Sequence, residues 1–390
     1  MVYDLIVRNA SLVLGSGVQE GIIAVKDGMI ARVGREIPDC RAAEVIDASG
    51  DYLAPGVVDL HTHGAGGFDY MDGTVEDILG AARAELGNGT TTVLPTTLTS
   101  SDEDLFLFLD NFKTAQGSSA LLPRMPGVHL EGPYFDMVQK GAQDPRYIRE
   151  PERRHYLGIV EKADGVIKRW SLAPELPGAI DMLDDLADEG ILFSAGHTAA
   201  TYDDISRAYD HGVRLLTHFY SGMSSIERKG GWRILGAVES GYLIDDLSVE
   251  IIADGLHLPP QLLTLIFKCK KHDRITACTD SMRGAGMPDG PSILGPKDNG
   301  QEVIVEDGIA KMPDRSCFAG SVATGIRLVR TLSRLLPLSE VAAITSLQPA
   351  RLIGMDNEIG SIEAGKKADF IIFDKNIDLT AVFIGGRRFA

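Results

Sequence analysis

Six residues that commonly bind divalent metal ions stand at or near the ends of short apolar runs in this chain. The six are His61 and His63 after VVDL, Glu131 in GVHLEGP, His197 after ILFSAG, His218 after VRLLT, and Asp280 after RITACT. Imidazole nitrogens and carboxylate oxygens are the ordinary ligands of zinc-like ions. A cation bound this way can lower the pKa of water enough to make it a nucleophile at neutral pH. The residue types therefore point to metal-assisted hydrolysis, provided that the fold brings them together.

His61 and His63 are separated by one residue, so in a strand their side chains project to the same face. Two imidazoles at that spacing can hold one divalent ion. The alternative is that they are two polar loop residues beside the glycines of residues 64–67.

Glu131, His197 and His218 form a two-histidine, one-carboxylate set. Three protein ligands leave coordination positions open, which is typical of catalytic rather than structural zinc. The alternatives are a helix-capping role for Glu131, ahead of Gly132-Pro133, and ordinary core or loop histidines at the other two positions.

Asp280 ends the last apolar run, where a carboxylate can take a proton from water and pass it to a leaving group. Its alternative role is the N-cap of a following helix. His129 shares a strand face with Glu131 and is expected to orient a ligand through a hydrogen bond. His257 follows IIADG and is expected to contact substrate, whereas the remaining histidines lie in charged stretches and are expected at the surface: His155, His211 and His272.

These residues need a fold that gathers strand ends. Strand-like runs alternate with helical patterns, which is typical of parallel strands joined by crossover helices. The runs are 57–63, 91–97, 125–132, 167–175, 191–197, 213–219, 247–255 and 274–281. Eight such units predict an α/β fold, a (β/α)8 TIM-type barrel, in which catalytic groups gather at the carboxyl ends of the strands. Helical patterns continue over 320–336 and 339–355.

The two ends of the chain share a residue pattern that differs from that of the middle. Residues 1–54 and 356–390 are rich in valine and isoleucine runs broken by glycine, asparagine and aspartate turns. Because chain ends commonly lie close together at a domain surface, we expect one small β-sandwich domain from 1–54 plus 356–390. The barrel hydrolase domain would then span 55–355.

Composition limits the partners and the compartment. A formal charge of −17 argues against nucleic acid or an anionic membrane. The four cysteines (Cys40, Cys269, Cys278 and Cys317) are scattered without a CxxC pair, which favours reduced thiols over a disulfide frame or a closed zinc cluster. The first residues lack the pattern of a signal peptide. We therefore expect a cytoplasmic protein.

The ordered motifs resemble the amidohydrolase superfamily and, within it, the N-acetylglucosamine-6-phosphate deacetylases. The resemblance covers nearly the whole chain. It rests on APGVVDLHTHG, HLEGPY followed by KGAQ, SAGHTAATYDD, LTHFYSGM, IIADGLH, the TDS of Asp280, FAGS and the tail GSIEAGKKADFIIFD.

The resemblance implies roles for individual residues. Glu131, His197 and His218 would hold the main metal, while His61 and His63 match the two-metal version of the site. Asp280 corresponds to the general acid/base. Gln143 would lie beside the acetyl group, His257 would bind the sugar, and Ala319 lies in a loop that would line the acyl pocket. A homodimer is also implied.

One region departs from the family pattern. Members usually have Asn-Ala-Met after the sixth-strand histidine, followed by an arginine that reaches the sugar phosphate across a dimer interface. This chain has Ser221-Gly222-Met223 and then SSIERKGGWRILG. Backbone N–H groups near Gly222 could meet an anion, and Arg228, Lys229 or Arg233 could replace the arginine; the alternative is a solvated basic loop.

The expected reaction is deacetylation of N-acetylglucosamine 6-phosphate, or a close N-acetylhexosamine phosphate, to the amino sugar phosphate and acetate. One or two divalent ions would serve, with zinc the first choice over iron, cobalt or manganese, since such a ligand set accepts all of them. Two rivals stay open. One is another amidohydrolase, such as an N-acyl amino acid deacylase or a cyclic-amide hydrolase, and the other is a non-catalytic barrel scaffold.

Overall fold

Each of the eight predicted runs contains a strand in the computed structural model, which describes residues 2–37 and 41–389. The strands are β6 (Val57–Thr62), β9 (Thr90–Pro95), β10 (Val128–Glu131), β11 (Ile167–Leu172), β12 (Leu192–Ala195), β13 (Val213–Leu216), β16 (Ser248–Ile252) and β17 (Ile275–Cys278). Every residue of β6, β9, β10, β12 and β17 is buried. Burial on both faces explains why these runs are not restricted to alternating apolar residues.

The eight strands run parallel to the neighbours with which they pair. A six-stranded parallel sheet has the order β10-β11-β12-β13-β16-β17, and β6 pairs in parallel with β9. Isolated parallel bridges link Thr96 to His129 and Thr62 to Ser281. The carboxyl ends therefore point the same way, and residues that follow different strands can meet.

Helices separate the strands, and three of them begin at a capping side chain. The helices are α1 (Val75–Gly87), α2 (Asp102–Gln116), α3 (Arg153–Ala163), α4 (Ala179–Asp185), α5 (Tyr202–Asp210), α6 (Ala237–Leu243) and α7 (Pro260–Cys269). The side chains of Thr74, Ser101 and Thr201 accept hydrogen bonds from the first turns of α1, α2 and α5. Such caps satisfy backbone donors that have no partner inside the helix.

The helical segment after the eighth strand begins later than predicted. Residues Phe318–Ser321 form strand β21, and α8 covers Gly325–Leu332. The expectation of a helix from residue 320 was therefore wrong at its start. The next segment holds α9 (Leu338–Ala342), a π-helical turn over Ala343–Leu347, and α10 (Gln348–Leu352), with Pro349 in the first turn of α10.

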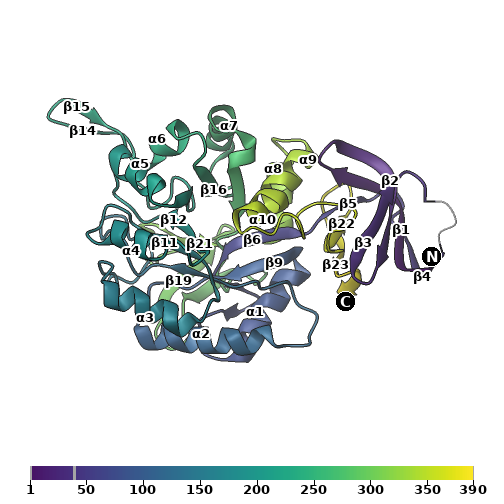
Figure 1. Ribbon diagram of the computed structural model, residues 1–390, viewed down its shortest axis with the longest axis horizontal. Coiled ribbons are helices and arrows are strands. Elements are labelled where there is room, and N and C mark those ends of the chain that lie inside the picture. The colour runs from purple at the N-terminus through teal and green to yellow at the C-terminus, as the bar shows by residue number, and fades with distance from the viewer. Residues whose placement is uncertain (1, 38–40, 390) are drawn as a thin grey trace.

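Strands from both chain ends share one sheet, as Figure 1 shows at the right of the molecule. Its eight strands are β1 (Val2–Leu14), β2 (Gly17–Lys26), β3 (Met29–Gly34), β4 (Arg41–Asp47), β5 (Tyr52–Pro55), β22 (Phe370–Phe373), β23 (Leu379–Ile384) and β24 (Arg387–Phe389). Along β22, Phe370 and Ile372 pack in a core of terminal residues, while Ile371 and Phe373 pack in the main core. Alternating side chains thus attach the sheet to the rest of the protein.

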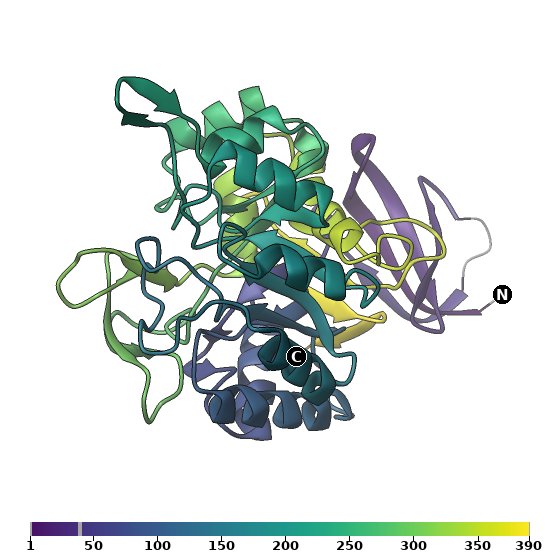
Figure 2. The same ribbon diagram turned by 60° about the vertical axis from the view of Figure 1, so that its left-hand side comes forward.

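Three further antiparallel elements were not anticipated. A four-stranded sheet contains β18 (Gly290–Leu294), β19 (Gln301–Glu306), β20 (Ile309–Lys311) and β21. A hairpin of β14 (Glu227–Lys229) and β15 (Trp232–Ile234) projects from the body in both Figure 1 and Figure 2. A short pair, β7 (Gly64–Ala65) and β8 (Phe68–Asp69), follows the first parallel strand.

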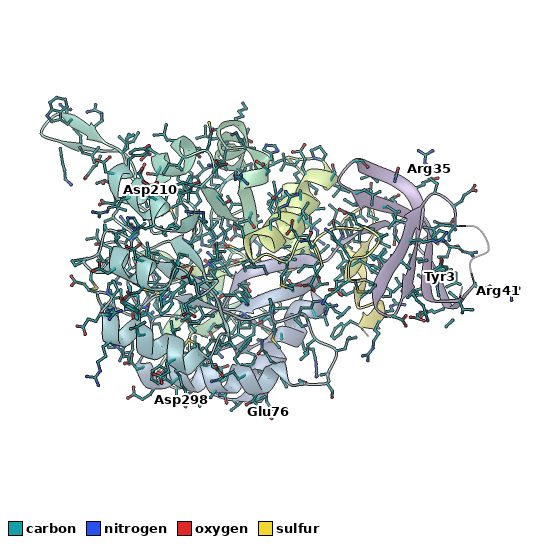
Figure 3. The ribbon with its side chains drawn as sticks, viewed as in Figure 1. Tyr3, Arg35, Arg41, Glu76, Asp210 and Asp298 are labelled. Atoms are coloured by element: carbon teal, nitrogen blue, oxygen red, sulfur yellow. The ribbon has the colours of Figure 1, made fainter. Side chains whose placement is uncertain are left out.

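The surface carries much of the acidic excess. Glu76, Asp210 and Asp298 are exposed, and Figure 3 shows Glu76 and Asp298 at the lower edge of the molecule. Among the described residues, no helix is long and apolar enough to cross a membrane. Cys269, Cys278 and Cys317 are free thiols, in agreement with the sequence analysis, and Cys40 lies outside the described residues.

Phe383→Ala should test the terminal core. Phe383 is fully buried and stacks on Phe370 with ring centroids 4.4 Å apart. Loss of the ring leaves a cavity, so we expect the free energy of unfolding to fall by about 3–5 kcal/mol. Urea denaturation measures the change. Val18→Ala, at a position that is 45% exposed, should change it by less than about 0.5 kcal/mol; equal effects would contradict this packing.

Candidate metal centre

Glu131, at the end of β10, lies at the middle of the predicted ligand set. Its Oε1 atom is 3.3 Å from His61 Nε2, 3.3 Å from His197 Nε2 and 3.2 Å from His218 Nε2. Its Oε2 atom is 3.4 Å from His63 Nε2. One carboxylate thus faces all four predicted histidines, which come from three different strand ends.

Asp280 completes the set on the side of the first strand. Its Oδ1 atom lies 3.4 Å from His61 Nε2 and 3.3 Å from His63 Nε2. The six predicted residues therefore form two adjoining groups of potential ligands, His61–His63–Asp280 and Glu131–His197–His218. Glu131 contacts both groups, so its two oxygens could serve two cations or one.

The hydrogen bonds of His197 fix which nitrogen is free. Its Nδ1 atom lies 2.9 Å from the carbonyl oxygen of Gln139. A carbonyl only accepts, so Nδ1 carries the proton and Nε2 presents a lone pair to the set. The Nε2 atoms of His197 and His218 are 3.1 Å apart, and those of His61 and His63 are 3.3 Å apart. Paired lone pairs at these distances suit a shared cation.

The backbone turns sharply at three of these residues. His197, His218 and Asp280 have φ values of 47°, 33° and 47°. Non-glycine residues rarely adopt this left-handed conformation, and such strain gathers at functional sites. The capping alternatives do not hold, since α3 after Glu131 has Glu152 as its N-cap and the next helix after Asp280 begins at Gly325.

Electrostatics also favour a cation. Burial raises the pKa of Glu131, but His61 and hydrogen bonds from His197 and His218 lower that pKa well below its usual range. Burial lowers the pKa of His61, yet the carboxylates of Glu131 and Asp280 raise it to about 10. Glu131 and Asp280 thus stabilise positive charge on the His61 ring that lies between them. Together with the lone pairs of the imidazoles, this donor set fits a divalent metal ion.

Gln143 contacts the ligand set through a hydrogen bond to Glu131. Its Nε2 donates to Glu131 Oε2 at 2.6 Å, and its Oε1 accepts from the backbone N–H of Thr99 at 2.9 Å. One amide hydrogen therefore orients the carboxylate and the other remains for a ligand. His129 lies beside the ring of His61, with centroids 4.7 Å apart, and its own nitrogens face hydroxyls of Thr96 and Ser171.

A pocket opens over this cluster. Its lining includes Gln143, Gly222, His257 and Asp280. His257 Nδ1 lies 2.9 Å from Asp254 Oδ2, which orients the ring. Gly222 has a φ of 55°, and a Cβ there would lie 2.9 Å from His197 Nδ1, so the loop needs glycine at this point.

Two of the residues predicted to contact substrate, Ala319 and Arg228, do not line this pocket. Ala319 packs in a cluster with Met282 and Leu294, whereas its neighbours Phe318 and Gly320 line the pocket. Arg228 is exposed on β14, in the projecting hairpin.

His155 was expected at the surface, and this was wrong because Tyr134 Oη lies 2.7 Å from its Nδ1 and the side chain is half-buried.

Sequence reasoning missed several residues around the site. Arg169 and Glu250 lie inside buried strands, and Glu175 accepts hydrogen bonds from the Thr198 hydroxyl and the Ala199 N–H just after His197. A charged residue within an apolar strand is the signal that could have found the first two, because buried charges are rare unless paired.

Comparisons with known proteins agree with this geometry. The model of the amidohydrolase family matches residues 52–389. N-acetylglucosamine-6-phosphate deacetylase of Bacillus subtilis is 32% identical over 99% of this chain and 97% of its own length. N-acetylgalactosamine-6-phosphate deacetylase of Escherichia coli O157:H7 is 30% identical over 94% of this chain and 93% of its own.

Solved structures of deacetylases also superpose on this chain. The N-acetylglucosamine-6-phosphate deacetylase of Pasteurella multocida superposes with a TM-score of 0.90 at 28% identity, covering 99% of each chain. The enzyme of the same name from Mycobacterium smegmatis also gives a TM-score of 0.90, at 26% identity, over 99% of this chain and all of the other.

Glu131→Ala tests whether this carboxylate joins the two groups of ligands. Because Glu131 faces all four histidines, its loss should weaken zinc binding by at least about 100-fold, the upper end of what outer partners of a metal site contribute. Competition with a chromophoric chelator measures the affinity. Glu103→Ala, at an exposed position of α2, should bind like the wild type. Unchanged affinity in Glu131→Ala would remove Glu131 from the site.

Proposed function

This chain belongs to the amidohydrolase family, and we propose that it deacetylates N-acetylglucosamine 6-phosphate to the amino sugar phosphate and acetate. The observation that carries the proposal is the convergence of Glu131, four histidines and Asp280, all of which except His61 line one pocket. The names of its nearly full-length relatives supply the substrate.

The metal would be held by Glu131, His197 and His218, with His61 and His63 available for a second ion. Zinc is the first choice, and iron, cobalt or manganese would suit the same donors. When bound, such an ion supplies Lewis acidity toward the acetyl carbonyl and lowers the pKa of water. The remaining work falls to side chains of the pocket.

Asp280 would serve as the general base and then as the general acid. Burial raises its pKa, but His61 and His63 lower it below the usual value, so the group is an ionised carboxylate at neutral pH. The same carboxyl would then protonate the departing amine nitrogen. The free amide hydrogen of Gln143 would donate to the acetyl oxygen, and His257, held by Asp254, would contact the sugar.

The phosphate needs a basic partner. Among the described residues that line the pocket, none is lysine or arginine. Arg228, Lys229 and Arg233 lie on the exposed hairpin with Trp232, which is 78% exposed. We assign Arg228 to the phosphate, with the backbone near Gly222 as a second anion contact. A homodimer, in which one copy extends this hairpin toward the other, would bring the arginine to a pocket.

The architecture belongs to the same proposal. Residues 55–355 would form a closed (β/α)8 barrel, and the bridges Thr62–Ser281 and Thr96–His129 support closure between the paired strands. Residues 1–54 with 356–390 would form a separate small β-sandwich domain, supported by their shared sheet. The family's metabolic relatives favour a cytoplasmic location.

The galactosamine epimer is a second candidate, because a deacetylase of that substrate is nearly as similar as the glucosamine enzymes. An N-acyl amino acid deacylase or cyclic-amide hydrolase has less support, since the relatives reported above act on acetylated hexosamine phosphates. A non-catalytic scaffold is disfavoured because all six ligand positions are retained.

Asp280→Asn tests the proton transfer. Asparagine keeps an oxygen near the histidines but cannot accept a proton at neutral pH, so turnover should fall by about 10²–10⁴-fold while metal content stays at the wild-type level. Release of acetate and metal content are measured on one preparation. Asp289→Asn, at an exposed position, is the control. Full activity in metal-replete Asp280→Asn would exclude the role.

Arg228→Ala tests the phosphate assignment with a panel of N-acetylglucosamine and N-acetylgalactosamine, each with and without the 6-phosphate. Loss of a charge-assisted hydrogen bond should raise KM for the phosphorylated sugar by about tenfold or more. KM for the unphosphorylated sugar should not change. Arg388→Ala, on the terminal sheet, is the matched control. No turnover of any member by the metal-replete wild type would refute the proposed function.

A further inference from the structure

One guanidinium group lies beneath the ligand cluster and bonds to residues on, or directly after, four other strands. Arg169, on β11, is fully buried. Its Nε donates to Ser194 Oγ on β12 at 3.2 Å, its Nη1 to the carbonyl of Leu60 on β6 at 3.1 Å, and its Nη2 to Thr217 Oγ1 after β13 at 3.1 Å. Its remaining two N–H groups bind Glu250 on β16. All five donors of the arginine are therefore used.

The positions of these contacts are specific to the metal centre. Leu60 precedes His61, and Thr217 precedes His218. Arg169 thus holds the residue before one ligand of each group. A planar group with five fixed donors sets the spacing of these strand ends more rigidly than apolar packing alone would.

Glu250 extends the contact to the ligands themselves. It is fully buried, and its two oxygens lie 2.5 and 2.8 Å from Arg169 Nη1 and Nη2. Its Oε2 atom also accepts from the backbone N–H of His218 at 3.3 Å and lies 3.5 Å from Nδ1 of His61. A carboxylate on that side favours the proton on Nδ1, which leaves Nε2 of His61 free to face Glu131 and Asp280.

The same corner could be mistaken for a third metal site, because His61, Glu250 and Cys278 offer three potential ligand atoms close together. Arg169 argues against a cation there, since its positive charge already occupies both oxygens of Glu250. The Cys278 thiol is buried, and burial raises its pKa well above the usual value. A neutral thiol is a poor ligand.

We infer that the Arg169–Glu250 pair is a positioning device for the metal centre, which orients His61 and the strand end that carries His218. The inference rests on the proposed metal site and goes beyond it. A buried ion pair is poor evidence of a role in stability, because replacement of both partners by apolar residues is often neutral. Removal of both charges can therefore separate positioning from folding.

The test compares the double variant R169M/E250L with the wild type. Its melting temperature should fall, because Ser194, Thr217 and the Leu60 carbonyl also lose a donor, so zinc binding is compared at a temperature at which both proteins are folded. Its zinc affinity should fall about 10–100-fold, the usual effect of lost outer partners of metal ligands. The visible spectrum of its cobalt-substituted form should change, because His61 is no longer oriented, and kcat should fall more than KM rises.

A matched control is R124M/D369L. Arg124 binds both carboxylate oxygens of Asp369, which is almost fully buried, at the edge of the terminal sheet. Its zinc affinity and cobalt spectrum should match the wild type. Should R169M/E250L not fold, Thr217→Val removes one anchor of Arg169 and should still weaken zinc binding several-fold.

The outcomes separate the two proposals. Wild-type zinc affinity and an unchanged cobalt spectrum in the folded variants would overturn the positioning role, whatever the substrate. If the wild type binds zinc but deacetylates no hexosamine, the proposed substrate fails, whereas weaker zinc binding by the variants would still support the positioning role. If the wild type binds none of zinc, iron, cobalt and manganese, both proposals fail.

Discussion

The arrangement of this protein depends on two buried carboxylates that need positive charge. Glu131 and Asp280 both lie within 3.4 Å of the Nε2 atoms of His61 and His63. Acids cannot be buried this way without hydrogen bonds and a compensating charge. Without a metal the imidazoles supply that charge only by binding protons, as the raised pKa of His61 indicates, and a divalent cation would supply it instead. The surrounding strands, turns and hydrogen bonds are best understood as the means of keeping these groups close despite their cost.

The fold keeps these groups together by placing them at the ends of parallel strands. Parallel strands deliver the ligands to one edge, and left-handed backbone at His197, His218 and Asp280 turns each side chain toward the centre. Gly222 fits against the ring of His197 because it lacks a Cβ. The terminal sheet packs on the main core through alternate residues of β22 and takes no part in the ligand set. The site residues thus all come from the part of the chain that forms the parallel strands.

Much of this could be predicted from the sequence because the signals were local. Apolar runs located all eight parallel strands, and histidines or acids near their ends pointed to six residues whose side chains do converge in the structure. The Arg169–Glu250 pair was missed because the two residues lie on strands that are distant in sequence. A charged residue within an apolar strand can be noticed in the sequence, but its partner cannot be identified there. The sheet of β18–β21 was missed since its strands are short and lie in a connection after the eighth strand. The orientation of Ala319 depends on tertiary packing, which spacing alone does not determine.

The most direct measurement is anomalous X-ray diffraction from crystals grown with zinc, recorded on both sides of the zinc absorption edge. The account predicts an anomalous peak within bonding distance of Glu131 and of Nε2 of His197 and His218, with any second peak beside His61 and His63. A zinc-replete crystal with no anomalous peak among these residues, or with its ion bound elsewhere, would contradict the central claim.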